Sequence, residues 1–164
     1  MQLTRFTDLG LRVVTYLAAT PPTDLPSTAL VAERLEMSYA HTTKVVARLG
    51  ELGVVSSRRG RGGGLAITEL GRTATIGWLT RQLEGQGDVV NCEGPTPCPL
   101  RGNCALRGAL RAAQDAFYSA LDTLTVADLT TRGNVAALPL PGLRTSPPDH
   151  HEENTCRSHP NPEK

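Results

Sequence analysis

The chain has 164 residues, with 17 lysine and arginine residues against 16 aspartate and glutamate residues, and a formal net charge of +1. This length suggests one domain, or one domain with appendages, and an aromatic content of only 4% predicts that the core of each protomer is small. No apolar run approaches the roughly 18 residues that a membrane span needs, and the first residues lack the apolar segment of a secretory signal, so we expect a cytoplasmic protein.

Residues 1–84 are predicted to form a winged helix-turn-helix domain within a fold that is mainly α-helical. Apolar residues at three- and four-residue steps predict a first helix over residues 3–19. A short second helix over residues 28–36 begins after Ser27, a residue type that often caps helices. Ser38 is predicted to cap a third helix that runs to about residue 52. Two short helices joined by a tight turn form the helix-turn-helix pattern.

The third helix has two unlike faces. Apolar residues, among them Val45 and Leu49, form the face that we expect to be buried. The first turns of a recognition helix reach base edges in the major groove. We assign five residues to this contact, which are Tyr39, His41, Thr42, Thr43 and Lys44. Arg48, further along the helix, is expected to meet a DNA phosphate.

A basic, glycine-rich tip between two short predicted strands, over residues 54–57 and 65–67, indicates the wing of a winged helix. Glycine lets the backbone approach a ligand surface closely, and arginine supplies charge and reach into the minor groove. The residues assigned to this contact are Arg58, Arg59, Arg61, Gly62 and Gly63. Between residues 38 and 63 five basic side chains stand against Glu51 alone, a local excess of four positive charges that suits double-stranded DNA.

Thr68 is predicted to cap a helix over residues 69–84, which Gly71 and Gly77 weaken and could break in two. A loop over residues 85–104 follows. Its prolines and glycines disfavour both helix and strand, because proline lacks an N–H group and glycine loses backbone entropy in regular structure.

The longest helix is expected over residues 105–122. Its apolar residues lie close to a heptad spacing, which favours a seam between two copies of the chain over packing against its own domain. Thr125 and Asp128 resemble a capping box that starts a last short turn. We therefore assign residues 105–131 to dimerisation. Residues 132–164 are rich in proline and polar residues, and we expect this tail to be disordered.

Three cysteines, Cys92, Cys98 and Cys104, stand at equal six-residue steps in the loop. Cytosolic thiols stay reduced, so clustered cysteines indicate metal binding or catalysis more than disulfides. The spacing lacks the closely paired ligands of most structural zinc sites, whereas iron–sulfur clusters accept varied spacings of thiolates. An iron–sulfur cluster is the favoured prediction, with a zinc site or three unrelated free cysteines as alternatives. A four-iron cluster needs one more ligand; Cys156 qualifies by residue type but lies in the tail.

Over about residues 1–129 the chain resembles the IscR/NsrR family of winged-helix regulators. The strings that carry the resemblance are LTRFTDLGLRVVTYLA near the start, RRGRGGGLAIT at the wing and CEGPTPCPLRGNC in the loop. It is closest to the NsrR-type members, the nitric-oxide-sensing repressors. The resemblance implies a homodimer with a 4Fe–4S cluster near the dimer interface. It also implies the ligands, which are Cys92, Cys98, Cys104 and, from the other protomer, Asp8.

Other branches of this family complete the cluster differently. IscR-type members use a histidine shortly after the last cysteine, around a 2Fe–2S cluster, but no such histidine follows Cys104 here. Another branch uses a glutamate and a histidine in the first helix, where this chain has Asp8 and Arg12. The residues alone offer a simpler account of Asp8, because the helix dipole favours an acidic side chain there and Arg12 can pair with it. The 2Fe–2S cluster is kept as the alternative cofactor.

The resemblance implies a transcriptional repressor that senses nitric oxide through its cluster, with nitrosylation releasing the DNA. As a dimer, it is expected to prefer a palindrome-like site. One alternative is a regulator of the same fold that senses redox state or iron supply. Others are an electron-transfer iron–sulfur protein, which would need no helix-turn-helix, and a zinc-stabilised DNA-binding protein. We do not expect an enzyme, because no nucleophile–base pair, phosphate loop or paired carboxylates stand out.

Overall fold

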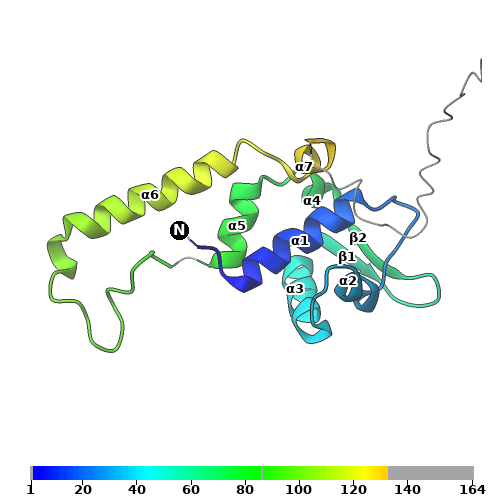
Figure 1. Ribbon diagram of the computed structural model, residues 1–164, viewed down its shortest axis with the longest axis horizontal. Coiled ribbons are helices and arrows are strands. Elements are labelled where there is room, and N and C mark those ends of the chain that lie inside the picture. Colours follow the sequence, from blue (N-terminus) through cyan, green and yellow to red (C-terminus); the bar gives the residue numbers. More distant parts are fainter. Residues whose placement is uncertain (1, 86, 133–164) are drawn as a thin grey trace, which may run out of the picture.

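The computed structural model of the protein describes residues 2–85 and 87–132, so the tail from residue 133 onward, with Cys156, lies outside the described residues. The helices are α1 (Arg5–Ala19), α2 (Thr28–Arg34), α3 (Tyr39–Glu51), α4 (Glu69–Thr73), α5 (Ile76–Glu84), α6 (Ala105–Leu121) and α7 (Val126–Arg132). The strands are β1 (Val55–Arg58) and β2 (Gly64–Ile67). The predicted fold class, mainly α-helical with a β-hairpin wing, is confirmed. In Figure 1 the cysteine loop and α6 form an arm that extends from the body built by the other elements.

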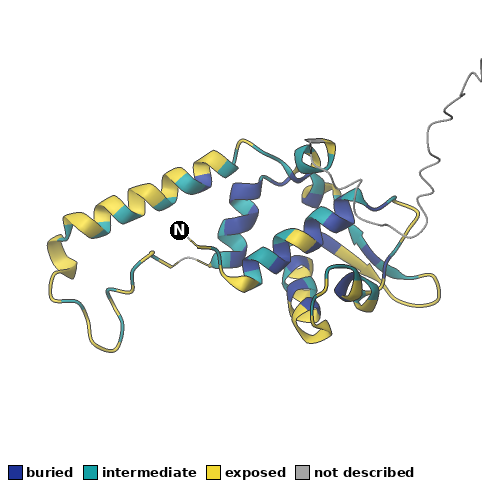
Figure 2. Cartoon of the chain, viewed as in Figure 1, coloured by how far each residue is buried: buried dark blue, intermediate teal, exposed yellow. Residues whose placement is uncertain are grey.

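The core lies around α1, which runs through the middle of the body (Figure 1). Val13 of α1 is fully buried, as are Val45 and Leu49 of α3 and Leu79 of α5. Burying a side chain of this kind stabilises the fold by about 1.5–3 kcal/mol. The buried face that the sequence predicts for the third helix is therefore confirmed, and its opposite face stays open to solvent (Figure 2).

Side-chain caps begin the helices at the predicted residues. The hydroxyls of Ser27, Ser38 and Thr68 each accept a hydrogen bond from a backbone N–H three residues ahead. Such a cap typically stabilises a helix by about 1 kcal/mol. The capping box is also present, because the Thr125 N–H donates to Asp128 Oδ2 at 2.9 Å and the Asp128 N–H donates to Thr125 Oγ1 at 3.2 Å.

The wing is an antiparallel hairpin of β1 and β2, with Val55 opposite Ile67. At its tip Gly60 has a φ of +99° and Gly62 a φ of +77°, a region that side-chain-bearing residues rarely adopt. At its base the Leu65 N–H donates at 2.9 Å to a carbonyl in the loop before α2, which anchors the hairpin to the helix-turn-helix.

The helix predicted over residues 69–84 is broken in two, at Ala74 and Thr75 and not at a glycine. Ala74 adopts an extended conformation, and Thr75 caps the second helix, α5. Backbone pairing with the segment between α6 and α7 holds the break. The Ile76 N–H donates to a carbonyl of that segment at 2.8 Å, and the Val126 N–H donates to the Ala74 carbonyl at 3.1 Å.

The last turns of α6 are joined to α5 by a close and polar junction. A Cβ added at Gly77 would clash with the carbonyl oxygen of Tyr118, so glycine allows the two helices to approach. Arg81 pairs with Asp122 at 2.6 Å, and its guanidinium lies 4.9 Å from the centre of the Tyr118 ring. The hydrogen bonds from Arg81 and then Thr75 hold the pKa of Asp122 below its usual value.

Most of α6 has no cover in a single chain. Tyr118 is its one buried residue, and Leu106 near its start is 66% exposed. Figure 2 shows the exposed residues running along the helix. The alternative in which the helix packs along its own domain is therefore limited to its last turns. Among the described residues, no helix combines the length and apolar character needed to cross a bilayer.

Candidate nucleic-acid interface and metal centre

The first turn of α3 presents polar side chains to solvent, as a recognition helix requires. Tyr39 is 60% exposed, and His41, Thr43 and Lys44 are exposed as well. His41 is oriented by the start of its own helix, because its Nδ1 lies 2.9 Å from Ser38 Oγ. These side chains are accessible to another molecule, and their contact with DNA stays a prediction.

Thr42 lies differently from the prediction. It is fully buried, and its hydroxyl donates to the Ser38 carbonyl at 3.0 Å. The reason is the helical period: Thr42 stands three residues before Val45 and therefore shares the face that packs on the core. The side chain of Thr42 is therefore not accessible for the major-groove contact predicted for it, and this residue instead helps to fix the helix start.

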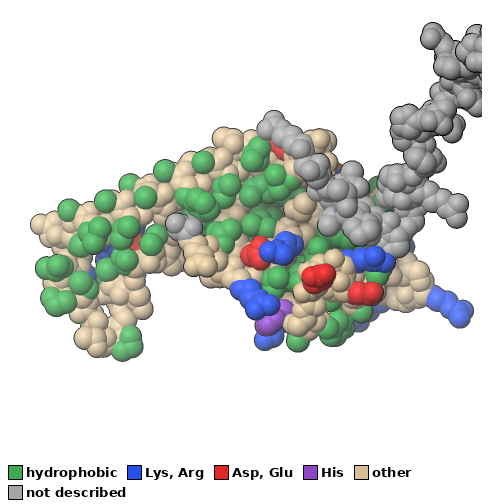
Figure 3. Space-filling model, in the orientation of Figure 1, with side chains coloured by type: hydrophobic (Ala, Val, Ile, Leu, Met, Phe, Trp, Pro, Cys, Tyr) green, Lys and Arg blue, Asp and Glu red, His purple; other side chains and the backbone are tan. Residues whose placement is uncertain are grey.

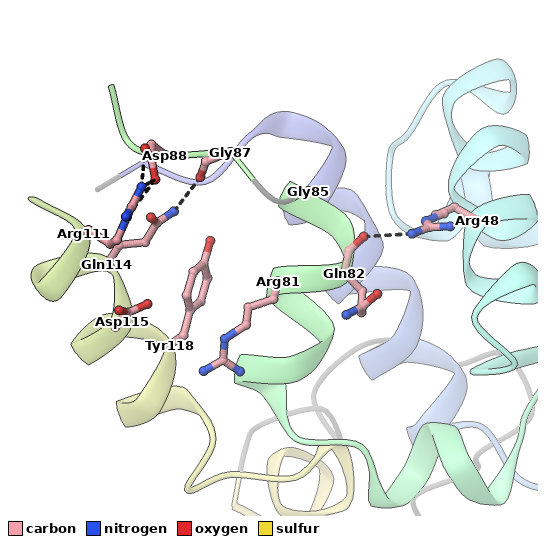
Figure 4. Close-up of a pocket in the computed structure, with 10 residues that line it drawn as sticks. All are labelled: Arg48, Arg81, Gln82, Gly85, Gly87, Asp88, Arg111, Gln114, Asp115 and Tyr118. Atoms are coloured by element: carbon pink, nitrogen blue, oxygen red, sulfur yellow. Dashed lines mark hydrogen bonds and ion pairs between the residues drawn. The ribbon is translucent and has the colours of Figure 1, made fainter. Parts of the chain in front are cut away.

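Arg48 is directed towards α5. Its Nη2 donates to the carbonyl of Gln82 at 3.3 Å, and its Nη1 pairs with Glu51 at 3.1 Å. Figure 4 shows this link at one end of a cleft of about 350 Å³, with Arg81 and Tyr118 between α5 and α6. The predicted phosphate contact of Arg48 is untested, but the observed bonds connect the predicted recognition helix to the helix that leads into the cysteine loop.

The tip of the wing carries exposed basic side chains. Arg58, Arg59 and Arg61 are exposed, and their side chains make no hydrogen bond or ion pair within residues 2–85 and 87–132. Gly62 is exposed beside them, while Gly63 is half-buried and has no room for a Cβ against the Arg58 carbonyl. Figure 3 shows basic side chains over α3 and at the tip of the wing. This arrangement suits the DNA contacts predicted for the wing.

The cysteine loop, residues 85–104, has no helix or strand among its described residues apart from one 3₁₀ turn, η1 (Arg101–Asn103). The Cys98 N–H donates to the Cys92 carbonyl at 3.0 Å and closes a turn between the two residues. Cys104 is the N-cap of α6, and its Sγ accepts the Arg107 N–H at 3.4 Å. All three thiols are free and half-buried.

A single chain does not gather these thiols into one site. Among the described residues, no group of three or more histidine, cysteine, aspartate or glutamate side chains lies close enough to hold a metal ion. The donors themselves suit an iron–sulfur cluster, because its usual ligands are thiolates and an N–H already donates to the sulfur of Cys104. Closing the site therefore requires the loop to draw its three thiols together.

Asp8 lies in the first turn of α1, where its Oδ1 accepts a hydrogen bond from Arg12 Nε at 2.9 Å. The pair that the residues alone predict is thus confirmed. The Asp8 side chain is 46% exposed, so its carboxylate is accessible to a second chain. Its role as a cluster ligand stays a prediction.

A charged group at the root of the cysteine loop was missed by sequence reasoning. Asp88 accepts hydrogen bonds from both Arg107 and Arg111 of α6, and Gln114 donates to a backbone carbonyl of the loop at 3.2 Å. The hydrogen bonds from Arg111 and then Arg107 hold the pKa of Asp88 below its usual value. The sequence does show that one face of the helix carries Arg107, Arg111 and Gln114. It does not show which residues of the loop this face contacts.

Comparison with known proteins supports the resemblance. The family model of Rrf2, an iron-dependent transcriptional regulator, matches residues 3–132. The HTH-type transcriptional repressor NsrR of Streptomyces coelicolor is 58% identical over 130 residues, which cover 79% of this chain and 88% of that protein. The HTH-type transcriptional regulator NsrR of Halalkalibacterium halodurans is 37% identical over 133 residues, covering 80% and 91%.

The fold has solved counterparts. The structure of T. potens IscR covers 80% of this chain and 87% of its own, with a TM-score of 0.63 and 21% identity, a likeness that concerns the fold alone. The family match over residues 3–132 takes in the winged helix, the cysteine loop and α6 together. The protein is therefore a member of the Rrf2 family of DNA-binding transcriptional regulators.

Proposed function

We propose that the protein is a homodimeric transcriptional repressor whose iron–sulfur cluster senses nitric oxide, and that nitrosylation of the cluster releases the DNA. The observation that carries the proposal is the cysteine loop, in which three free, half-buried thiols stand between a winged helix and a largely exposed α6. The name NsrR, borne by the repressor of Streptomyces coelicolor with 58% identity, supports the nitric-oxide signal. An anaerobic titration with nitric oxide, which follows nitrosylation of the cluster and DNA binding in the same samples, tests this function.

We propose that a second copy of the chain packs against the exposed apolar residues of α6. The apolar residues of its seam include Leu106, Leu110 and Phe117, and Leu106 is 66% exposed in the single chain. A heptad-like spacing suits packing against the same helix of another copy. Such a dimer would hold two recognition helices at a fixed separation, which fits a palindrome-like site on double-stranded DNA. We place this dimer in the cytoplasm.

Cys92, Cys98 and Cys104 would hold the cluster, with Asp8 of the partner subunit as its last ligand. A 4Fe–4S cluster is proposed, and iron and sulfide per chain distinguish it from the 2Fe–2S alternative. The cluster, when bound, supplies iron that reacts with nitric oxide. A carboxylate oxygen is a weaker ligand for iron than a thiolate, so Asp8 would leave one iron more open to attack.

The fold offers a route from the loop to the DNA-binding surface. Residue 85, where the cysteine loop begins, directly follows α5. Near that end the carbonyl of Gln82 accepts the hydrogen bond from Arg48 of α3 at 3.3 Å. A change in the loop that moves the last turn of α5 would therefore reach the recognition helix through one polar contact. This is a coupling between two sites in the thermodynamic sense, and it acts in both directions.

A regulator that senses iron supply or redox state with the same architecture is the second candidate. The description of the family as iron-dependent favours it. The two candidates differ in what removes DNA binding. A nitric-oxide sensor releases DNA when the intact cluster is nitrosylated, whereas an iron sensor responds to cluster loss and a redox sensor to reduction of the cluster.

The assignment of Asp8 can be separated from its ion pair by two variants. We expect Asp8→Ala to keep a cluster on the three cysteines but to change its magnetic circular dichroism spectrum, because one iron loses a carboxylate ligand. Arg12→Ala is the matched control, since it breaks the same ion pair and leaves the carboxylate. The pair is exposed and contributes only about 0.3–0.5 kcal/mol, so both variants should fold.

Native mass spectrometry under anaerobic conditions would check that both variants carry the cluster. The ligand assignment is contradicted if Asp8→Ala has the wild-type spectrum. It is equally contradicted if Arg12→Ala changes the spectrum as much as Asp8→Ala does, because the ion pair would then explain the effect.

A further inference from the structure

One carboxylate joins the root of the cysteine loop to α6. Asp88 accepts hydrogen bonds from Arg107 at 2.8 and 3.0 Å, and from Arg111 at 2.7, 2.8 and 3.1 Å. Each guanidinium approaches through two nitrogens, an arrangement that strengthens its interaction with a carboxylate. Figure 4 shows Arg111 reaching from α6 to Asp88, with Gln114 reaching to Gly87 beside it.

These ion pairs are less exposed to solvent than most ion pairs on a protein surface. The side chain of Asp88 is 24% exposed and that of Arg107 is 25% exposed, although Arg111 is 55% exposed. Solvent and salt screen exposed pairs, and two guanidinium groups around one partly buried carboxylate are screened less. Arg107 and Arg111 lie four residues apart, so they share one face of α6.

That face is not the apolar seam of α6. Arg107 follows Leu106, and Arg111 follows Leu110. One residue along a helix turns the side chain by about 100°. The contacts with Asp88 and the proposed packing of a second copy therefore use different faces of the same helix, and both can exist together.

Arg107 also connects this carboxylate to the predicted ligands. Its backbone N–H donates to Cys104 Sγ at 3.4 Å, and its Nη1 donates at 3.3 Å to Oε1 of Glu93, the neighbour of Cys92 in the chain. A single residue at the start of α6 thus interacts with both ends of the cysteine sequence.

We propose that Asp88 is a positioning residue of the cysteine loop: through Arg107 and Arg111 it keeps the root of the loop, and with it Cys92, beside the start of α6, where Cys104 caps the helix. The positioning of ligands by Asp88 rests on the proposed function, because it requires a cluster. The ordering of the loop by Asp88 does not require one. A loop that is held at its root has less conformational freedom to lose when its thiolates meet on one cluster.

Substituting Asp88 should change the loop without detaching α6. The helix has a separate anchor at its other end, where Tyr118 is buried and Arg81 pairs with Asp122 at 2.6 Å. A loss of cluster in an Asp88 variant would therefore report on the loop and not on the loss of the arm. Circular dichroism of each variant checks that the helices are retained.

The test compares Asp88→Asn with Asp88→Glu and Asp115→Asn in the full chain. Asparagine keeps the shape of the side chain and removes its charge, whereas glutamate keeps the charge. Asp115 is the matched control, because it is exposed on α6, lines the same cleft, and makes no hydrogen bond or ion pair among the described residues.

Two rates are measured in each protein. One is the loss of iron from anaerobically purified protein to a ferrous chelator, and the other is hydrogen–deuterium exchange over residues 87–104 in cluster-free chain. In Asp88→Asn we expect iron to be lost about tenfold faster, which is the lower end of the effect of removing a group that orients metal ligands. Exchange of the loop should also be faster. Asp88→Glu and Asp115→Asn should stay close to the wild type in both rates.

Iron loss at the wild-type rate in Asp88→Asn would overturn the proposal. An equal acceleration in Asp115→Asn would also overturn it, because acidic charge near the cleft would then be the cause. Faster loop exchange without faster iron loss would show that Asp88 orders the loop but does not position ligands. If Asp88→Asn does not fold, Arg111→Gln must show the same two changes.

Failure of the proposed function has a different signature. The wild-type protein would then contain no iron and sulfide after anaerobic purification. Hydrogen–deuterium exchange in the cluster-free chain would still decide whether Asp88 orders the loop, so the two failures are distinguishable.

Discussion

Cys98→Ser is expected to leave the protein almost without iron and sulfide, whereas Cys156→Ser leaves both at the wild-type level. Serine has nearly the shape of cysteine, and the turn at Cys98 is closed through backbone atoms, by its N–H on the Cys92 carbonyl at 3.0 Å. The loop should therefore keep its fold, but the thiolate ligand is lost. We expect iron and acid-labile sulfide per chain to fall by about tenfold or more, measured after anaerobic purification.

Cys156 is a suitable control because it lies outside both the described residues and the family match. Wild-type iron in Cys98→Ser would contradict the placement of the cluster on the loop. Loss of iron in Cys156→Ser would indicate that Cys156 of the tail, and not Asp8, is the last ligand of the cluster. Zinc in place of iron in the wild-type protein would favour the zinc-stabilised alternative.

The double variant Arg59→Ala, Arg61→Ala is expected to lose DNA affinity and much of its salt dependence. Both side chains are exposed at the tip of the wing and form no ion pair among the described residues, so their removal leaves the hairpin without a new defect. Each arginine that contacts a phosphate adds about 1 to the slope of log affinity against log salt. A dimer carries the change twice, so we expect the slope to fall by about 4 and the affinity at low salt by on the order of 100-fold.

The measurement is fluorescence anisotropy over a salt series, with a duplex that the wild-type protein has selected from a random-sequence pool. Arg144→Ala, Arg157→Ala in the tail is the matched control, because it removes the same charge from a segment outside the family match. Equal loss of affinity in both double variants would mean that net charge, and not the wing, drives binding. An unchanged slope in the wing variant would contradict the DNA contact proposed for the wing.

The parts of the fold that depend on residues close together in the sequence could be predicted from it. Ser27, Ser38 and Thr68 cap their helices through bonds that reach only three residues ahead, so the residue type at one position is enough. The turn at the tip of the wing could be predicted from its glycines, because glycine adopts the positive φ that this turn requires. Thr42 shows the limit of reading by residue type. It is polar and stands in the first turn of α3, but the helical period places it inside the core.

Contacts between distant segments could not be predicted in this way. The break at Ala74 depends on backbone groups of residues 124–126, which come alongside only in the folded protein. Asp88 and Arg107 are 19 positions apart in the sequence, and the loop between them has no periodic pattern that would indicate their contact. The cluster site is a further case, because its proposed last ligand, Asp8, belongs to a second copy of the chain.

An anaerobic titration tests most directly whether the reaction of the cluster with nitric oxide controls DNA binding. Cluster-loaded protein is bound to the selected fluorescent duplex, and nitric oxide is added in steps. Anisotropy gives the DNA-bound fraction, while native mass spectrometry of the same samples gives the fraction of nitrosylated protein. We predict that DNA is released in step with nitrosylation. Full DNA binding after complete nitrosylation would contradict the proposed function.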